Sequence, residues 1–165
     1  MPFNLELKIK AVSHAPFIFA LKNAGAENMG ILKQKDVYYR VKKGLLKLRI
    51  ENGSFTLIKY LRDEKGKRWS NYELLRLQGL NPEKYLNEIF DVEAVVEKKR
   101  KLYLYKNTRI HLDDVKTLGK FLELETLLTS DRKDAVNRFN EIIKILNLDT
   151  AKQIRASYKN LLMKK

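Results

Sequence analysis

Three segments that lie far apart in the sequence carry charged or amide side chains on alternate residues. They are residues 4–8 (Asn-Leu-Glu-Leu-Lys), 96–100 (Val-Glu-Lys-Lys-Arg) and 121–125 (Phe-Leu-Glu-Leu-Glu). Alternate side chains of a β-strand share one face, so each segment would present its polar groups together. Carboxylate oxygens suit a hard divalent cation, and paired lysine and arginine suit phosphate oxygens. If the three faces converge, they could bind a metal ion and a polyphosphate together.

Two more segments show the same alternation: Lys47/Arg49/Glu51 and Arg109/His111/Asp113. For any single stripe, the solvent-facing side of a sheet is the simpler interpretation. Amphipathic helices need an apolar sheet face to cover, and if they cover the outside of a curved sheet, the charged stripes face its interior. Taken together, the stripes predict a charged tunnel.

The composition is that of a folded, strongly basic domain. The chain has 165 residues, 44% of them apolar, which fits one domain over residues 1–165. Its formal net charge of +14 favours an anionic partner: a nucleic acid, an acidic membrane surface or a small phosphate compound. Because there is no cysteine, disulfides and thiolate metal sites are excluded, and carboxylates would bind Mg²⁺ or Mn²⁺.

The longest apolar run near the N-terminus, residues 15–21, does not suit a membrane. It is far shorter than the ~20 residues that a helix needs to cross a bilayer. Glu6, Pro16 and Lys22 interrupt the layout of a signal peptide. We therefore expect a cytoplasmic protein without a membrane partner.

Many short strands and a few helices are expected along the chain. Period-two patterns predict strands at residues 3–11, 36–42, 46–51, 54–61, 69–76, 92–100, 101–105, 108–113 and 120–127. Capping residues and amphipathic patterns predict helices at residues 16–24, 82–90, 131–146 and 151–162. Asn52-Gly53 suits a primed hairpin turn, and residues 63–66 suit another turn. Eight or nine strands with about four helices indicate an α+β fold, either an open sheet or a closed barrel.

The ordered set of motifs resembles the CYTH superfamily of triphosphate tunnel metalloenzymes. Residues 108–125 carry the strongest likeness, to the branch of class IV adenylyl cyclases and thiamine triphosphatases. The remaining motifs are residues 4–8, Gln34 and Asp36 before Tyr38, residues 44–49 and residues 96–100. Each motif is weak alone, but their order along residues 4–125 is specific.

The resemblance implies an eight-stranded antiparallel β-barrel whose charged lumen binds a triphosphate-containing small molecule. The phosphate contacts would be Lys8, Lys47, Arg49, Lys59, Lys98, Arg100 and His111. The ligands of Mg²⁺ or Mn²⁺ would be Glu6, Glu123, Glu125 and Asp113. We expect Lys8, Arg100 and Asp113 to act in catalysis. For His111, a place in the core or at the surface is an equal alternative.

One part of the chain departs from the family pattern, and another adds to the resemblance. The superfamily opens with Glu-x-Glu-x-Lys, whereas Asn4 stands at the first glutamate here. An amide oxygen can bind a metal, but it brings no negative charge and is the poorer ligand. The C-terminal residues 157–162 resemble a closing segment of the class IV branch and would plug the tunnel.

Three functions are compatible with these expectations. We favour a metal-dependent triphosphatase acting on a nucleoside, thiamine or inorganic triphosphate. A class IV-type adenylyl cyclase, which makes cyclic AMP and pyrophosphate from ATP, is the first alternative. A non-catalytic binder of polyphosphate or nucleic acid is the second, favoured by Asn4 and by lysines beyond those of the tunnel. The sequence is also compatible with a homodimer, and it does not indicate which triphosphate is bound.

Overall fold

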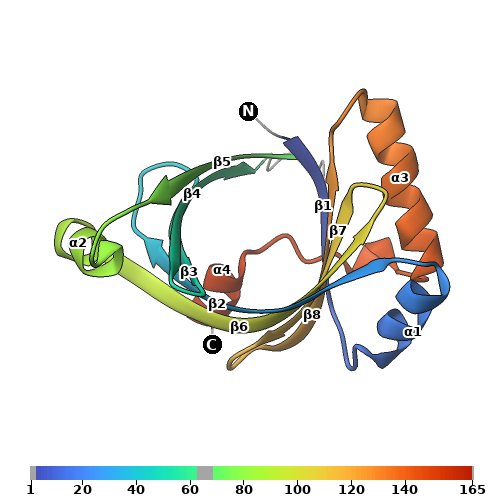
Figure 1. Ribbon diagram of the computed structural model, residues 1–165, viewed down its shortest axis with the longest axis horizontal. Coiled ribbons are helices and arrows are strands. Elements are labelled where there is room, and N and C mark those ends of the chain that lie inside the picture. The colour runs from blue at the N-terminus through green and yellow to red at the C-terminus, as the bar shows by residue number, and fades with distance from the viewer. Residues whose placement is uncertain (1–2, 63–68, 165) are drawn as a thin grey trace.

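Eight antiparallel strands close into a barrel in the computed structural model, which describes residues 3–62 and 69–164. The strands are β1 (Phe3–Lys10), β2 (Glu27–Tyr39), β3 (Leu45–Glu51), β4 (Ser54–Arg62), β5 (Trp69–Leu77), β6 (Val92–Tyr105), β7 (Thr108–Val115) and β8 (Gly119–Leu127). The helices are α1 (Ala15–Asn23), α2 (Pro82–Ile89), α3 (Arg132–Ile145), the 3-10 turn η1 (Thr150–Lys152) and α4 (Tyr158–Met163). Around the ring the strands follow the order β1-β5-β4-β3-β2-β6-β7-β8 (Figure 1). The expected α+β barrel of eight antiparallel strands is confirmed.

Two of the three apolar clusters lie outside the barrel wall, and the third, which includes Tyr38, Phe121 and Tyr158, closes one end of the bore. Leu7, Ile110 and Leu124, from β1, β7 and β8, belong to one buried cluster with Leu21 of α1 and Phe139 of α3. In Figure 1, α1 and α3 lie together on one side of the ring and α2 lies on the opposite side. Because the helices cover the apolar face of the wall, the alternate side chains of each strand point into the bore.

Tight turns and caps set the register of these elements. Asn52 and Gly53 both have positive φ, 48° and 75°, which confirms the primed turn expected between β3 and β4. The side chains of Asn81 and Asp131 accept backbone hydrogen bonds at the starts of α2 and α3, as expected. The turn expected at residues 63–66 lies outside the described residues.

Two strands are longer than the sequence pattern predicts. β2 begins at Glu27 rather than at Asp36, and β6 runs unbroken through residues 92–105, where two strands are expected. The first half of β2 pairs only with β6 and is mostly exposed, so no buried face imposes an alternating pattern on it. In β6 the basic residues 98–101 hide the continuity of the strand, because its buried and its exposed positions there carry the same kind of side chain.

After α3 the chain crosses one end of the bore. The amide of Ile154 donates a hydrogen bond to the carbonyl oxygen of Lys8, 2.8 Å away, which holds this segment beside β1. Ser157 then accepts a hydrogen bond of 3.1 Å from the amide of Asn160 and caps α4. The single helix predicted at residues 151–162 is therefore wrong, since non-helical residues 153–157 separate η1 from α4. Among the described residues, no helix is long and apolar enough to cross a membrane.

Candidate functional site

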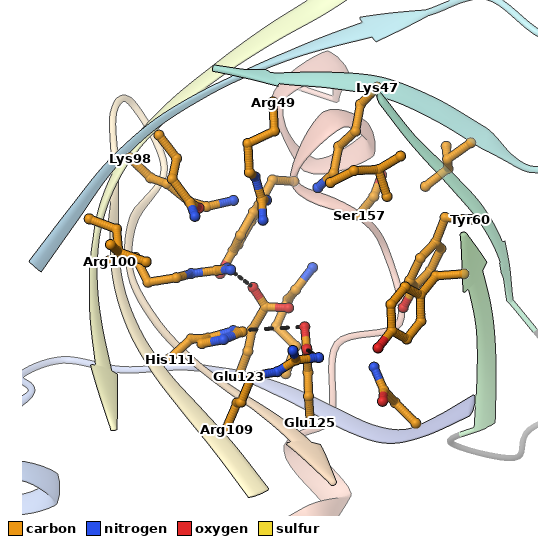
Figure 2. A pocket seen from close by; sticks show the side chains of 18 of the residues that line it. Lys47, Arg49, Tyr60, Lys98, Arg100, Arg109, His111, Glu123, Glu125 and Ser157 are labelled. Carbon is orange, nitrogen blue, oxygen red and sulfur yellow. Dashed lines mark hydrogen bonds and ion pairs between the residues drawn. The ribbon is translucent and has the colours of Figure 1, made fainter. Parts of the chain in front are cut away.

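All eight strands contribute side chains to a cavity in the bore. Its volume is about 260 Å³, which suits a small molecule rather than a single ion or water. The C-terminal segment adds Ser157 and Tyr158, which form its floor. Figure 2 shows Lys98 and Arg100 on one side of this cavity and Tyr60 on the opposite side.

Asp36 of β2 holds three cations together on one side of the bore. This carboxylate is fully buried and accepts hydrogen bonds from Lys47 Nζ (3.0 Å), Arg49 Nε and Nη2 (both 2.8 Å) and Lys98 Nζ (3.2 Å). Burial alone would raise the pKa of Asp36, but Arg49, Lys47 and Lys98 hold it well below its usual value. One negative charge thus positions three positive ones, which leaves a surplus of positive charge for an anionic ligand.

Lys98 is the most perturbed of these cations. Only 5% of the residue is exposed, and burial lowers its pKa to about 7, although Asp36 opposes the shift. The neighbouring guanidinium groups of Arg100 and Arg49 lower the pKa further. The charge of Lys98 therefore depends on pH in the neutral range, and an anionic ligand beside it would favour the charged form.

Asp113 of β7 fixes Arg100 of β6. Arg100 donates from Nε to Oδ1 and from Nη2 to Oδ2 of Asp113, each at 2.7 Å, and its Nη2 also lies 2.9 Å from Glu123 Oε1. The hydroxyl of Tyr158 donates to Asp113 Oδ2 at 2.7 Å. Burial would raise the pKa of Asp113, but Arg100 holds it far below its usual value. Both carboxylate oxygens of Asp113 are thus engaged by the side chains that they orient.

Glutamates line the side of the bore formed by β1 and β8. Glu6 and Glu125 lie directly opposite each other on these neighbouring strands. Glu6 accepts a hydrogen bond from the hydroxyl of Tyr60, and Glu125 accepts one of 2.7 Å from Arg109 Nη2. Two like charges in facing positions repel each other, and a cation between them would relieve that repulsion.

His111 lies beside this acidic group. Its Nδ1 is 3.8 Å from Glu125 Oε1 and has no hydrogen-bond partner among the described residues. Burial and the charge of Arg100 lower the pKa of His111 to about 3, although Glu125 opposes them. The imidazole is therefore neutral at physiological pH. One of its ring nitrogens then carries a hydrogen and can donate a hydrogen bond, and the other can accept a hydrogen bond or a proton.

Oxygen donors for a hard cation are present at the β1–β8 side. Asn4 is 2% exposed, lines the cavity, and its buried Oδ1 has no hydrogen-bond partner in the described part of the chain. This amide oxygen and the facing carboxylates of Glu6 and Glu125 fit Mg²⁺ or Mn²⁺ in donor chemistry. Across residues 3–62 and 69–164, however, no three Asp, Glu, His or Cys side chains are grouped as a metal site. The predicted set of Glu6, Glu123, Glu125 and Asp113 does not gather around one point.

The floor of the cavity brings cations against an aromatic ring. Lys8 Nζ lies 4.1 Å from the centre of the Tyr158 ring and donates to the carbonyl oxygen of Ala156 at 3.0 Å. Lys98 Nζ lies 5.1 Å from the same ring, and Phe121 packs against its edge. The C-terminal segment therefore closes one end of the bore, and the expected plug has a structural counterpart in Tyr158.

Most of the predicted phosphate contacts line the cavity: Lys8, Lys47, Arg49, Lys98, Arg100 and His111. Lys59 is the exception. Its side chain is 50% exposed and its Nζ lies 3.5 Å from Glu73 Oε1 on the outer face. Its strand neighbours Ile58 and Tyr60 face the bore instead. Lys59 is therefore not among the residues that the structure brings to the site.

Two tyrosines of the lining, Tyr60 of β4 and Tyr72 of β5, are not indicated by the charged stripes of the sequence. A signal for Tyr60 was present, because the turn between β3 and β4 pairs Lys47 with Ile58. That register places even-numbered residues 56–60 in the bore and Lys59 outside it.

Comparisons with known proteins agree with this architecture. A model of the CYTH domain matches residues 3–158. This chain belongs to the CYTH family. CYTH proteins bind triphosphate compounds and are typically metal-dependent.

Individual relatives of this CYTH chain were also found. A Methanocaldococcus jannaschii protein named "Putative adenylate cyclase MJ0240" is 29% identical over 169 residues, covering 94% of this chain and 95% of that protein. The structure of the PH1012 protein of Pyrococcus horikoshii OT3 matches with a TM-score of 0.80 and 23% identity, over 96% of this chain and 98% of that one. The Hippeastrum protein HpAC1, which is described as having a dominant triphosphatase activity, matches with a TM-score of 0.70 and 13% identity, over 99% and 96% of the two chains. At these identities the two solved structures support the fold alone.

Proposed function

We propose that this CYTH protein is a metal-dependent phosphohydrolase that acts on a triphosphate-containing compound bound in the bore. The observation that carries the proposal is the convergence of buried cations on one cavity in the bore. Lys8, Lys98 and Arg100 are each at most 6% exposed and all line it. Burying this many cations is costly unless anions balance them, and a polyphosphate supplies several negative charges in a row.

The cations would act by position and charge. Asp36 holds Lys47, Arg49 and Lys98 on one side of the phosphate chain, and Asp113 holds Arg100 next to them. Phosphoryl transfer builds negative charge on oxygens that such fixed donors stabilise, with no reorganisation during the reaction. No covalent nucleophile is needed for this chemistry.

The β1–β8 side of the bore would hold the metal. Glu6 and Glu125 would bind Mg²⁺ or Mn²⁺ with the amide oxygen of Asn4, and Glu123 would stay paired with Arg100. When bound, the metal would polarise phosphate oxygens and lower the pKa of water. The neutral imidazole of His111 could accept a hydrogen bond or a proton next to Glu125.

A second candidate is a class IV-type adenylyl cyclase. The name of the Methanocaldococcus jannaschii relative favours it, as does its coverage of nearly the whole chain. The same cations would then stabilise charge on the departing pyrophosphate, and the ribose 3′-hydroxyl would attack the α-phosphorus. We rank hydrolysis first because it needs only side chains that bind the phosphates and side chains that bind a metal ion. The bore offers candidates for both roles.

A third candidate is a non-catalytic binder of polyphosphate or nucleic acid. Asn4 favours it, because the facing glutamates have an uncharged neighbour where a further carboxylate would strengthen metal binding. A nucleic-acid complex would rest on surface lysines and would weaken steeply with salt. A ligand in the bore would be much less sensitive to salt, since its partners are buried.

One set of assays separates the three candidates. ATP, thiamine triphosphate and tripolyphosphate are each incubated with Mg²⁺ or Mn²⁺, and orthophosphate, pyrophosphate and cyclic AMP are measured. We expect metal-dependent release of orthophosphate. Formation of cyclic AMP with pyrophosphate would assign the cyclase instead. Tripolyphosphate binding without turnover under any metal condition would leave the non-catalytic binder.

A further inference from the structure

The cavity has two sides of different chemistry. Among the described lining residues, the lysines, arginines, histidine and glutamates come from five strands: β1, β3, β6, β7 and β8. The described residues of β4 and β5 that line it are Ile58, Tyr60, Tyr72 and Leu74, and we name these four the β4–β5 patch. Among the lining residues that the structure describes, no charged side chain interrupts this patch.

The register makes the patch continuous. Tyr60 lies directly opposite Tyr72 on the neighbouring strand, and Ile58 lies opposite Leu74. The four side chains therefore form two adjacent cross-strand pairs on one face, which is the closest packing that neighbouring strands allow. The hydroxyl of Tyr60 is held by Glu6, so its ring is fixed at the boundary between the patch and the acidic side.

The patch also reaches nearer to solvent than the cations do. Leu74 is 53% exposed, whereas Lys98 and Arg100 are each 5% exposed. An anion that binds the buried cations would lie deep in the bore, and anything attached to that anion would pass along Ile58 and Leu74 toward solvent. Inorganic tripolyphosphate would leave this apolar surface in contact with water only.

We propose that the ligand is a triphosphate ester of an aromatic or apolar organic group, and that this group lies against the β4–β5 patch. The inference rests on the proposed function, because it assumes that a triphosphate occupies the charged side of the bore. The tyrosine rings offer flat surfaces on which a planar group stacks, and Ile58 and Leu74 offer apolar contact. Inorganic tripolyphosphate would bind more weakly than such an ester, because it has no organic group to contact the β4–β5 patch.

Direct binding measurements test the inference. Isothermal titration at 0.3 M KCl with Mg²⁺ compares methyl triphosphate with the four ribonucleoside triphosphates and thiamine triphosphate. Methyl triphosphate is the matched ligand, because it is a triphosphate ester that lacks an aromatic group. We expect at least one aromatic ester to bind about tenfold more tightly or better, as is typical for one stacked ring.

Two leucines of the same strand supply a matched pair of variants. Leu74→Ala removes a contact of the patch, while Leu75→Ala alters the next residue, which is similarly exposed at 57% but points out of the bore. We expect Leu74→Ala to weaken the best aromatic ester about threefold to tenfold and to leave methyl triphosphate within about twofold. Leu75→Ala should change neither. Tyr72→Ala should act in the same direction as Leu74→Ala.

The outcomes separate this inference from the function on which it rests. If every ester binds as tightly as methyl triphosphate, the proposed role of the patch is wrong and the triphosphate site stands. If Leu74→Ala and Tyr72→Ala weaken methyl triphosphate as much as the aromatic ester, the patch serves only to hold the barrel together. If no triphosphate binds at all, both the proposed function and the inference are overturned.

Discussion

Arg100 and Asp113 face each other on strands β6 and β7 and share two hydrogen bonds of 2.7 Å. Both oxygens of the Asp113 carboxylate accept hydrogen bonds from the Arg100 guanidinium, and Oδ2 also accepts one from the Tyr158 hydroxyl. The main effect of Asp113 is therefore to fix where the positive charge of Arg100 lies. Asp113 then influences a bound phosphate through Arg100, and it differs in this from Glu6 and Glu125, which lie on the side where the metal is proposed.

Asp113→Asn tests this indirect role. The variant keeps the size of the side chain but removes the charge that orients Arg100, so we expect kcat to fall about tenfold to a hundredfold. The Mg²⁺ concentration that gives half-maximal rate should stay unchanged. A large rise in that concentration would instead make Asp113 a metal ligand. Asp114→Asn is the control, because Asp114 is exposed and pairs with Lys120 on the outer face.

Binding of a polyphosphate should depend on pH through Lys98. Burial lowers the pKa of this lysine to about 7, so its charge is present below pH 7 and is lost as the pH rises through that value. We expect the affinity for a metal-free triphosphate to fall about tenfold between pH 6 and pH 8 for this reason. Lys98→Arg keeps the charge throughout and should remove this part of the pH dependence. The ligand itself also ionises with pH, but this contributes equally to both proteins. The difference in pH dependence between the unchanged protein and Lys98→Arg therefore reports on Lys98 alone.

Lys47 and Lys59 form a matched pair of an inner and an outer lysine. Lys47 Nζ lies 3.0 Å from Asp36 inside the bore, whereas Lys59 pairs with Glu73 outside it. Lys47→Ala should weaken tripolyphosphate binding about tenfold to a hundredfold, the range for a lost charge-assisted contact. Lys59→Ala should leave the dissociation constant within about twofold. Equal effects of the two variants would show that net charge, and not the bore, governs binding.

Asn4→Glu should strengthen the metal site. The added carboxylate would lie next to Glu6 and Glu125, so we expect Mn²⁺ to bind about tenfold more tightly and metal-dependent turnover to rise. Isothermal titration with Mn²⁺ measures the first effect without any substrate. Asn4→Gln lengthens the side chain without adding charge and should show neither change. If Asn4→Glu also leaves Mn²⁺ affinity unaltered, the cation binds elsewhere or not at all.

The sequence predicts the barrel and most of its lining because alternation has a direct physical cause. Once the helices are known to cover an apolar face, side chains such as Lys47 and Arg49 have only the interior left to occupy. Lys59 lies outside the bore because the register of a strand, and not the charge of a side chain, decides which face that side chain takes. The two-residue turn at Asn52 already decides that Lys59 faces outward.

Other features depend on contacts that no local pattern contains. Closure of the barrel rests on a short pairing of β1 with β5, which joins residues 3–5 to residues 69–71, far away in the sequence. The position of Tyr158 depends on Asp113, Lys8 and Phe121, which come from three different strands. A helical pattern in residues 151–162 could not reveal that this segment must stop being helical to cross the bore.

The placement of the core outside the wall separates two roles within each strand. Along β7, for example, Ile110 and Leu112 hold the helices while Arg109 and His111 face the bore. A substitution at Arg109 therefore alters the chemistry offered to a ligand and leaves intact the apolar contacts that Ile110 and Leu112 make with the helices. Such a barrel can acquire new substrates during evolution one lining residue at a time, without being rebuilt.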